Sequence, residues 1–408
     1  MIGSSGFGAL SGVVVLDLTR MLSGPYASML FADQGATVIK VEPLFGDDTR
    51  KLHPFPRADG KLEFGAYYQS INRNKVDIAI DLKQDEGREI ILRLVGKSDI
   101  LLENFRVGVM ERMELAYERL REINPRLVYG AIRGFGDPRT GVSPYQDWPA
   151  YDIVAQAMGG VVGITGPKGG TPTKVGPGIG DTIPAVFCAF AALSALHHAR
   201  ATGRGQFVDV AMVDAILAMC ERPVYQYSYQ GKIAEPEGNG HPEFAPYGLF
   251  EAADGWVAIG CPRDDFWTTF CQIMGRPELA TAQGFETIAA RRDNAQQVNA
   301  IVSAWAIQKT KAELTGLLGG VIPYGPVNTA EDFYRDPHVA SRAMLREVNH
   351  PGSGRAFVIA NTPIRMTETP GGVNAPAPLL GEHSDPILRF AGYKDDQIAS
   401  LRDRAIVK

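Results

Sequence analysis

Short apolar runs rich in β-branched residues recur along the first half of the chain, and stretches with helical spacing separate them. These runs cover residues 12–19, 36–42, 76–82, 99–103, 127–133 and 207–211. A short and almost continuously apolar run is typical of a strand with both faces buried, as in a parallel sheet. Strands that alternate with helices predict βαβ units. We therefore expect an α/β fold built on a doubly wound, Rossmann-like sheet.

The stretches between the expected strands carry helix signals. Residues 23–34 and 85–95 have a helical pattern, and apolar residues recur at helical spacing from Val109 to Ile123 before Asn124-Pro125 ends that pattern. We expect a single helix over 109–123. The turn at residues 20–25 lacks the G-x-G-x-x-G fingerprint of dinucleotide-binding folds, which weakens the case for a nicotinamide oxidoreductase.

The pattern changes in the second half of the chain. Residues 225–246 are polar and rich in Gly, Pro and Glu, which indicates a linker or lid that leads into a second domain. Beyond them, Asp254-Gly255 between two apolar runs predicts a β-hairpin. A capping box at residues 310–313 marks the start of one of several expected helices. The C-terminal tail is long enough to return to the first domain.

The composition is that of a globular protein with two or three domains, because 408 residues exceed one ordinary core. The net charge of -5 and the lack of a basic run with interleaved aromatics argue against a nucleic-acid partner. The first ten residues lack the basic and apolar regions of a secretory signal. We expect no apolar stretch long and unbroken enough to span a bilayer, and hence a cytoplasmic protein without a membrane partner.

The cysteines and histidines do not suggest a metal site. The seven histidines are scattered and form no H-x-x-x-H pair. The cysteines lack metal-ligand spacing and lie mostly in apolar surroundings, so we expect buried free thiols. They are Cys188, Cys220, Cys261 and Cys271.

The stretch Val175–Asp181 (VGPGIGD) brings three glycines and one carboxylate to the start of a long, alanine-rich apolar run. Glycine lets the backbone pass close to another group. Asp181 ahead of such a run, with Pro184 in the first turn, is typical of a helix N-cap. Alternatively Asp181 is a nucleophile, because a helix N-terminus keeps an aspartate ionised and offers N–H groups to a developing oxyanion. These residues alone do not decide between the two roles.

Taken in order, the motifs of the chain resemble one family. They read LDLTRMLSGPYAS, GATVIKVE, GDDTR, NRNKVDIAIDL, DILLENF, NPRLVYGAIRGFG, YDIVAQA, GIGD, TGRGQFVDVAM, IPYGPV and LLGEHS, from about Leu10 to Ile387. The ordered set is similar to the class III CoA-transferases, which include formyl-CoA:oxalate and carnitine CoA-transferases, and to the α-methylacyl-CoA racemases.

The resemblance implies a domain organisation and an oligomeric state. Residues 1–205 and 335–408 would form a Rossmann-like, CoA-binding large domain, and residues 225–330 an inserted small α+β domain. Residues 206–224 and 331–334 would be linkers. Two subunits, each shaped as a ring, would interlock in a homodimer.

The resemblance also implies the chemistry. In the transferases, the aspartate of the Gly-Asp pair before the long helix is the nucleophile, and this aspartate corresponds to Asp181. It would attack an acyl-CoA thioester to form a mixed anhydride, which the CoA thiolate converts into an aspartyl-CoA thioester. A free carboxylic acid would then accept the CoA. Both donor and product are thioesters, so we expect neither ATP, a metal nor a tightly bound cofactor, with CoA entering as substrate.

Several residues are implied as CoA contacts. Basic side chains would meet the phosphates, and an aromatic ring would lie against the adenine. The candidates are Arg20, Lys75, Asn104, Phe105, Arg112 and Arg133. Lys75 and Arg133 stand at strand ends, where ligands of α/β sheets bind. Arg112 lies on an amphipathic helix, where a solvated charge is an equal alternative.

The substrate-side candidates are Tyr151, Gly238, Gly240 and His241. The last three fall where the family has a glycine-rich loop that would shield the anhydride from water, although a surface linker is an equal alternative. Arg20, Arg133 and His241 could serve a dicarboxylate such as succinate, mesaconate, malate or glutarate. Tyrosines between residues 225 and 229 leave aromatic acids open as well.

Two other functions stay open at this point. The racemases carry a histidine directly before the aspartate that corresponds to Asp152. Here Tyr151 stands in that place, and tyrosine is a poor base at neutral pH, which disfavours racemisation. A CoA-binding protein without chemistry would require that Asp181 be an N-cap only.

Overall fold

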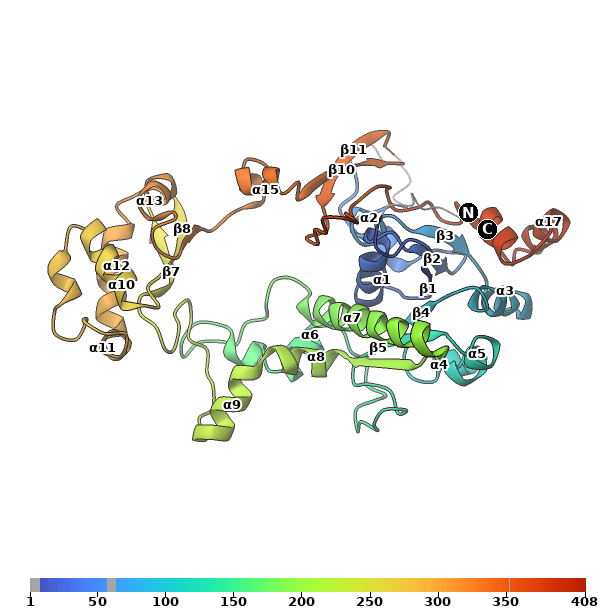
Figure 1. Ribbon diagram of the computed structural model, residues 1–408, viewed down its shortest axis with the longest axis horizontal. Coiled ribbons are helices and arrows are strands. Elements are labelled where there is room, and N and C mark those ends of the chain that lie inside the picture. Colours follow the sequence, from blue (N-terminus) through green and yellow to red (C-terminus); the bar gives the residue numbers. More distant parts are fainter. Residues whose placement is uncertain (1–7, 57–63, 352) are drawn as a thin grey trace. The chain divides into compact units, whose positions relative to one another are not determined.

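The computed structural model describes residues 8–56, 64–351 and 353–408, and it divides into two compact units (Figure 1). The large unit comprises the described parts of Met1–Val161, Val175–Val224 and His338–Lys408. The small unit comprises Val162–Lys174 and Tyr225–Pro337. Segments from both halves of the chain therefore build the large unit.

Six parallel strands form the centre of the large unit. They are β1 (Val14–Asp17), β2 (Thr37–Glu42), β3 (Val76–Ala79), β4 (Ile100–Glu103), β5 (Val128–Arg133) and β6 (Phe207–Ala211). Their order is β3-β2-β1-β4-β5-β6, and every neighbouring pair is parallel. This is the strand order of a Rossmann sheet, so the predicted α/β class is confirmed. The order reverses between β1 and β4, where such sheets leave a ligand crevice.

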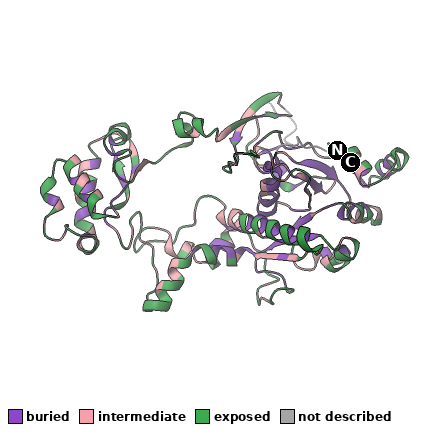
Figure 2. Cartoon of the chain, in the orientation of Figure 1, coloured by how far each residue is buried: buried purple, intermediate pink, exposed green. Residues whose placement is uncertain are grey.

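Helices cover both faces of this sheet, and the strands β1 to β5 are therefore almost wholly buried, whereas the edge strand β6 is partly exposed (Figure 2). On one face, the strands share a hydrophobic core with α3 (Asp85–Val95), α5 (Tyr117–Ile123), α16 (Ser384–Phe390) and α17 (Asp395–Asp403). On the other face, α1 (Ser23–Asp33) and α7 (Ile179–Thr202) pack against each other and against the strands. Gly130 in β5 lets α7 approach, because a Cβ there would lie 3.3 Å from Sγ of Cys188.

Both expected linkers are parts of the units. In the segment 206–224, β6 pairs with β5, and α8 (Met212–Met219) packs on α7 and on α6 (Asp152–Met158). At the other junction, α14 (Ala330–Phe333) belongs to the small unit. The polar segment that indicated a linker, residues 225–246, begins within α9 (Glu221–Gln230).

The single helix expected over 109–123 is two helices, α4 (Val109–Arg112) and α5. Glu114 between them has a φ of 56°, a left-handed conformation that a right-handed helix does not contain. The break places Leu115 in the hydrophobic core that the sheet shares with α3, α5, α16 and α17. Apolar spacing did not signal it, because both helices keep their buried residues at helical intervals.

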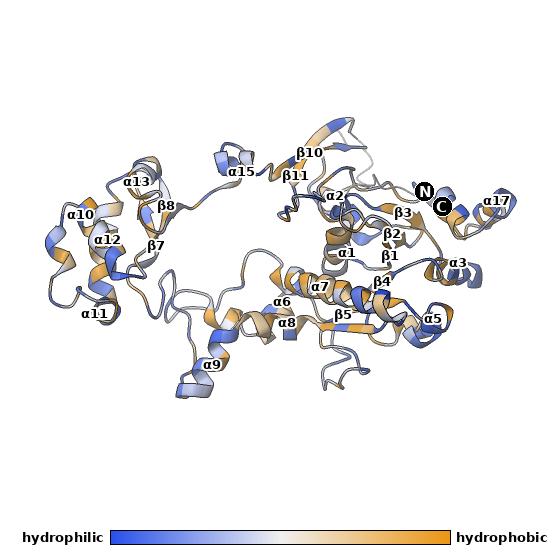
Figure 3. Ribbon diagram, in the orientation of Figure 1, coloured by the Kyte–Doolittle hydropathy of each residue, from blue (hydrophilic) through white to orange (hydrophobic). Residues whose placement is uncertain are grey.

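α7 is apolar enough and, with 24 residues, long enough to cross a membrane, although we expected no such stretch. Length and composition are weak evidence, because core helices of soluble proteins pass the same test. One side of α7 is buried against β5, β6 and α1. The other side exposes Val186, Phe187, Phe190 and Leu193, and α7 is accordingly rich in orange in Figure 3.

The small unit has a core of its own. Its antiparallel strands are β7 (Tyr247–Ala252), β8 (Gly255–Gly260) and β9 (Tyr324–Pro326). They pack against α10 (Asp264–Ile273), α12 (Ala295–Ala306) and α13 (Lys311–Leu318), with α11 (Ile288–Asp293) beside them. The predicted hairpin is confirmed as β7–β8, and so is the capping box, between Thr310 and Glu313.

Further elements of the large unit are α2 (Ala66–Asn72), most of α15 (Pro337–Ser341), β10 (Leu345–His350) and β11 (Arg355–Ala360). The C-terminal residues return to the sheet, where Val407 bridges Ile80 beyond the end of β3. All four cysteines are buried free thiols, as predicted.

Candidate active site

A cavity of about 310 Å³ lies at the carboxyl ends of β1, β4 and β5, where the strand order reverses. Residues 146–151 and the first turn of α7 complete its wall. All of the lining residues belong to the large unit. Six residues predicted from the sequence line this one cavity: Arg20, Asn104, Phe105, Arg133, Tyr151 and Asp181.

Asp181 is the third residue of α7 and not its N-cap. Gly178 holds the N-cap position, and Asp181 lies in the first turn, where the helix dipole favours a carboxylate. No cation or hydrogen-bond donor among the described residues contacts its carboxylate. Burial, and then the negative charge of Asp152, raise the pKa of Asp181 to about 7. Its pKa is therefore higher than expected for an aspartate that the helix start keeps ionised.

The close approach expected from the glycines of this stretch is to helix α6. A Cβ at Gly180 would lie 2.5 Å from the carbonyl oxygen of Asp152, so a larger residue does not fit. The Gly180 N–H donates to Oδ1 of Asp152 at 2.8 Å. At Gly178, a Cβ would lie 3.0 Å from Cδ2 of Leu22. The glycines thus bring the Asp152 carboxylate beside the helix turn that carries Asp181.

Two residues that the sequence analysis did not single out belong to this site. Gln156, one turn after Asp152 on α6, donates from Nε2 to both oxygens of Asp152, at 2.8 and 2.9 Å. Tyr67 on α2 faces the same group of carboxylates, since burial and then the charges of Asp181, Asp47 and Asp152 raise its pKa to about 12. The i, i+4 spacing on α6 was a visible signal for Gln156. Nothing in the sequence pointed to Tyr67.

Two hydrogen bonds with Asn104 hold the backbone of Arg20 at the cavity. Oδ1 of Asn104 accepts the Arg20 N–H at 2.8 Å, and Nδ2 of Asn104 donates to the Arg20 carbonyl at 2.8 Å. Met21, the next residue, has a φ of 64°, a conformation that is rare for residues with a side chain and concentrates at functional sites. Asn104 therefore positions Arg20, and both polar atoms of its amide are used within the protein.

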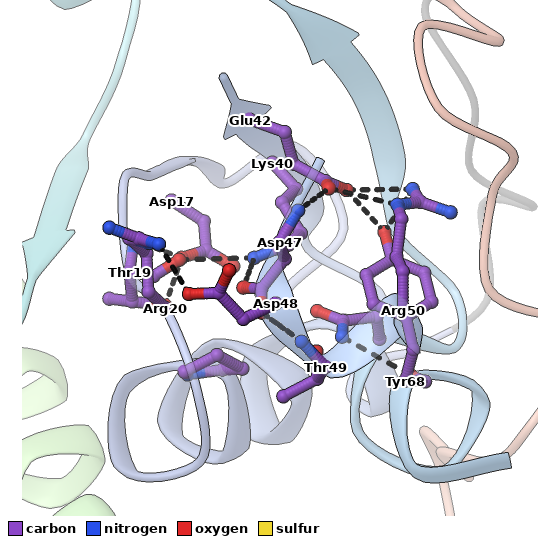
Figure 4. A network of polar contacts seen from close by, with 12 residues as sticks. Asp17, Thr19, Arg20, Lys40, Glu42, Asp47, Asp48, Thr49, Arg50 and Tyr68 are labelled. Carbon is purple, nitrogen blue, oxygen red and sulfur yellow. Dashed lines mark hydrogen bonds and ion pairs between the residues drawn. The ribbon is translucent and has the colours of Figure 1, made fainter. Parts of the chain in front are cut away.

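The Arg20 side chain lines the cavity and is 36% exposed. Its Nη2 pairs with Asp48 at 2.6 Å (Figure 4), whereas its Nε is buried and has no acceptor among the described residues. Behind this pair, Asp47 caps the short helix Asp48–Lys51 and pairs with the buried Lys40. Buried ion pairs thus fix Asp48 at the edge of the cavity.

Carboxylates of the protein already neutralise Arg133 and Lys75. Arg133 pairs through Nη2 with Glu103 at 2.6 Å and through Nη1 with Asp137. The ammonium group of Lys75 is buried, donates to Asp17 at 3.0 Å and lies within hydrogen-bond distance of three further oxygens. This placement argues against the predicted contact between Lys75 and a CoA phosphate. The Nε of Arg133 is buried and has no acceptor among the described residues.

Arg112 lines a second cavity, of about 660 Å³, and not the one that contains Asp181. Arg20 and Phe105 border both cavities, which are therefore neighbours. The wall of the second cavity is largely apolar, with Lys83 and Arg88 as additional cations. Together, the two cavities could accept the two ends of one long anionic ligand.

Gly238, Gly240 and His241 belong to the small unit. The Gly238 N–H donates to the Gly166 carbonyl at 3.0 Å. The His241 ring stacks on Phe244, with ring centroids 4.8 Å apart. These contacts are internal to the small unit, so a role of this loop as a cover over the substrate stays a prediction.

A Rossmann sheet whose ligand crevice holds an unpaired carboxyl group and a partly free arginine defines an α/β enzyme for an anionic ligand. Residues 10–384 match the model of CoA-transferase family III. The chain belongs to this family and is an enzyme of the CoA-transferase class. The family predicted from the ordered motifs is thereby confirmed.

Relatives with named activities align with nearly the whole chain. Succinyl-CoA:mesaconate CoA-transferase from Haloarcula hispanica is 46% identical, over 94% of this chain and 97% of its own. Succinate–glutarate CoA-transferase from Agrobacterium fabrum is 37% identical, over 93% and 94%. Succinyl-CoA–D-citramalate CoA-transferase from Chloroflexus aurantiacus is 36% identical, over 98% of both chains.

Solved structures agree with this assignment. A CaiB/BaiF family protein from Brucella suis aligns with a TM-score of 0.83 and 34% identity, and the alignment covers 94% of this chain and 100% of that one. Rv3272 from Mycobacterium tuberculosis aligns with a TM-score of 0.80 and 27% identity, over 93% and 99%.

Proposed function

We propose that this enzyme moves CoA from an acyl-CoA thioester to a free carboxylic acid, with Asp181 as the covalent nucleophile. The observation that carries the proposal is the isolation of the Asp181 carboxylate inside the cavity. Other carboxylates of the large unit are paired with cations, as Glu103 is with Arg133 and Asp17 with Lys75. A carboxylate without a partner, in the first turn of a helix, is free to attack and has backbone N–H groups nearby.

The exchange proceeds through four transfers that conserve atoms and charge. The Asp181 carboxylate attacks the donor thioester, which forms a mixed anhydride and releases the CoA thiolate. The thiolate attacks the aspartyl carbonyl, which expels the donor acid as its carboxylate and leaves an aspartyl-CoA thioester. The acceptor carboxylate then attacks this thioester and again releases the thiolate. Attack of the thiolate on the acceptor carbonyl forms the new acyl-CoA and frees Asp181.

Asp152 favours the covalent states. Its negative charge contributes to the raised pKa of Asp181, so the free enzyme carries a carboxylate that is more basic and hence more nucleophilic than usual. Acylation of Asp181 removes that charge, and the repulsion between the two carboxylates is relieved. The neighbouring anion thus destabilises the free nucleophile relative to the anhydride and the thioester.

We further propose a C4–C5 dicarboxylate, such as succinate, as one of the two acids. The relatives described above are named for succinate or succinyl-CoA together with mesaconate, glutarate or citramalate. Arg20 is the best placed partner for the second carboxylate, because it lines the cavity of Asp181 and its side chain pairs only with the partly exposed Asp48 among the described residues. Arginine suits this role through its planar, bidentate geometry.

CoA itself would lie across the two neighbouring cavities, with Phe105 and Arg112 toward its adenine end. A homodimer and a cytoplasmic location complete the proposal. The exposed apolar side of α7 and the exposed Tyr225, Tyr227 and Tyr229 offer surface for a second subunit. Four free thiols fit a reducing compartment.

The test is the intact mass of the protein after brief exposure to a panel of acyl-CoAs, with Asp181→Ala alongside. We expect a donor such as succinyl-CoA to add the mass of CoA less one water to the wild type only. If no donor marks the wild type although CoA binds, the nucleophilic role of Asp181 is refuted. Exchange of the α-proton of a 2-methylacyl-CoA with solvent would then indicate the racemase chemistry instead.

A further inference from the structure

Gln156 is a buried glutamine that uses both ends of its amide beside the nucleophile. Its side chain has no exposed surface. Nε2 donates to Oδ1 and Oδ2 of Asp152, at 2.8 and 2.9 Å, and Oε1 accepts the backbone N–H of Val175 at 2.9 Å. The Val175 contact fixes which way the amide faces, because a flipped amide would set an N–H group against an N–H group.

These bonds connect two segments that meet at Asp181. Through Oε1, Gln156 ties helix α6 to Val175, which opens the turn that leads into α7. Through Nε2 it orients Asp152, whose Oδ1 in turn accepts the Gly180 N–H at 2.8 Å. The chain of bonds from Gln156 therefore ends at the residue directly before the nucleophile.

We propose that Gln156 is a positioning residue, which holds Asp152 and the turn of residues 175–178 in the arrangement that aims Asp181 at the thioester carbonyl. The proposal rests on the nucleophilic role of Asp181. Gln156 is not among the residues that line the cavity, and it would act through its partners Asp152, Val175 and Pro177. A glutamine suits this task because one donor and one acceptor are needed at opposite ends of the same short group.

Loss of Gln156 changes the reacting geometry more than the binding of substrate. Without the amide, Asp152 loses the donor that holds both its oxygens, and the bond between Val175 and α6 through Gln156 is lost. The first turn of α7 is then held against α6 by the Gly180–Asp152 bond and by packing alone, without the bond to Val175. A displacement of about 1 Å at a reacting atom can slow a reaction on the order of 100-fold while the remote CoA contacts persist.

The first experiment compares Gln156→Leu with Gln69→Leu. Gln69 is a matched control, because it is also a buried glutamine in the large unit, and it accepts the Ala377 N–H at 2.9 Å and donates to the Asn349 carbonyl at 3.4 Å. Both variants lose internal hydrogen bonds and should unfold at lower temperature. We expect only Gln156→Leu to form the Asp181 adduct more slowly, by about 100-fold, with the KM for acyl-CoA changed by less than about threefold.

A charge swap provides the second experiment. Asp152→Asn places an amide opposite the Gln156 amide. Gln156→Glu places a carboxylate opposite the Asp152 carboxylate. Each single variant should therefore form the Asp181 adduct slowly. In the double variant, the new amide at position 152 can donate to the new carboxylate at position 156, which also accepts the Val175 N–H. We expect the double variant to form the adduct about tenfold faster than the slower single variant, a coupling that a double-mutant cycle measures.

Two results would overturn the positioning role. One is adduct formation in Gln156→Leu within about threefold of Gln69→Leu, and the other is a rise in KM with kcat unchanged. If Gln156→Leu does not fold, the charge swap decides, and a double variant no faster than either single variant refutes the proposal. Failure of the proposed function looks different, because the wild type itself would then form no adduct.

Discussion

Replacement of the proposed nucleophile should make the protein more stable as well as inactive. Asp181→Asn keeps the size of the side chain but removes a carboxylate that is half-buried beside Asp152 and contacts no cation among the described residues. Ionisation of Asp181 therefore costs free energy in the folded chain that it does not cost in the unfolded chain. Stability sacrificed at an active site is commonly regained when the reactive group is removed.

The magnitude follows from the pKa of Asp181, which is raised from 3.8 to about 7. A shift of this size corresponds to roughly 4 kcal/mol. Since the group lines an open cavity and is only partly shielded from water, we expect roughly 2–4 kcal/mol. Between pH 4 and pH 7 the folded state binds more protons than the unfolded state, so the free energy of unfolding falls as the pH rises through this window. Below pH 4 the penalty is absent.

The measurement is urea unfolding of the wild type and of Asp181→Asn at pH 5.0 and at pH 8.5. The variant should be more stable at both pH values, and its advantage should grow by about 1–3 kcal/mol between them. Asp214→Asn is the control, because Asp214 also lies in the first turn of a helix, α8, but is exposed. An advantage that does not change with pH, or a variant less stable than the wild type at pH 8.5, would refute the reasoning.

Three further variants test the roles of single residues. Arg20→Gln should lower kcat/KM for succinate roughly tenfold to hundredfold and spare butyrate, which lacks the second carboxylate; an equal loss for both acids would assign Arg20 to CoA or to the fold. Lys75→Met should lower the free energy of unfolding by about 3–5 kcal/mol, because it leaves a buried carboxylate uncompensated, and normal stability with a raised KM for CoA would contradict this. Gly180→Ala should cost about 1–3 kcal/mol of stability and most of the activity, since its Cβ overlaps α6. Gly176→Ala has open space around the new Cβ and should be nearly neutral in both assays.

Much of the large unit could be predicted because its signals are local. A strand that is buried on both faces must be apolar throughout, so the six strands were visible as six runs, and α3 begins and ends at the residues expected from its pattern. The break at Glu114 was not visible, because a left-handed residue in a loop leaves the apolar spacing on either side intact. The strand at 207–211 was expected, but the resemblance placed it in a linker, because its place in the sheet depends on a partner strand more than 70 residues away.

At the candidate site too, local signals could be predicted from the sequence and tertiary contacts could not. The order of the motifs alone indicated the family and singled out Asp181, since each motif is a local pattern of residues. Only the tertiary structure decided which charges are free: Arg133 and Lys75 look like phosphate ligands in the sequence, yet Glu103 and Asp17 neutralise them. The electrostatic energy of a charged group depends on its burial and on partners brought from distant segments. A linear sequence therefore supplies the chemical groups, while folding determines their pKa values and their availability to a ligand.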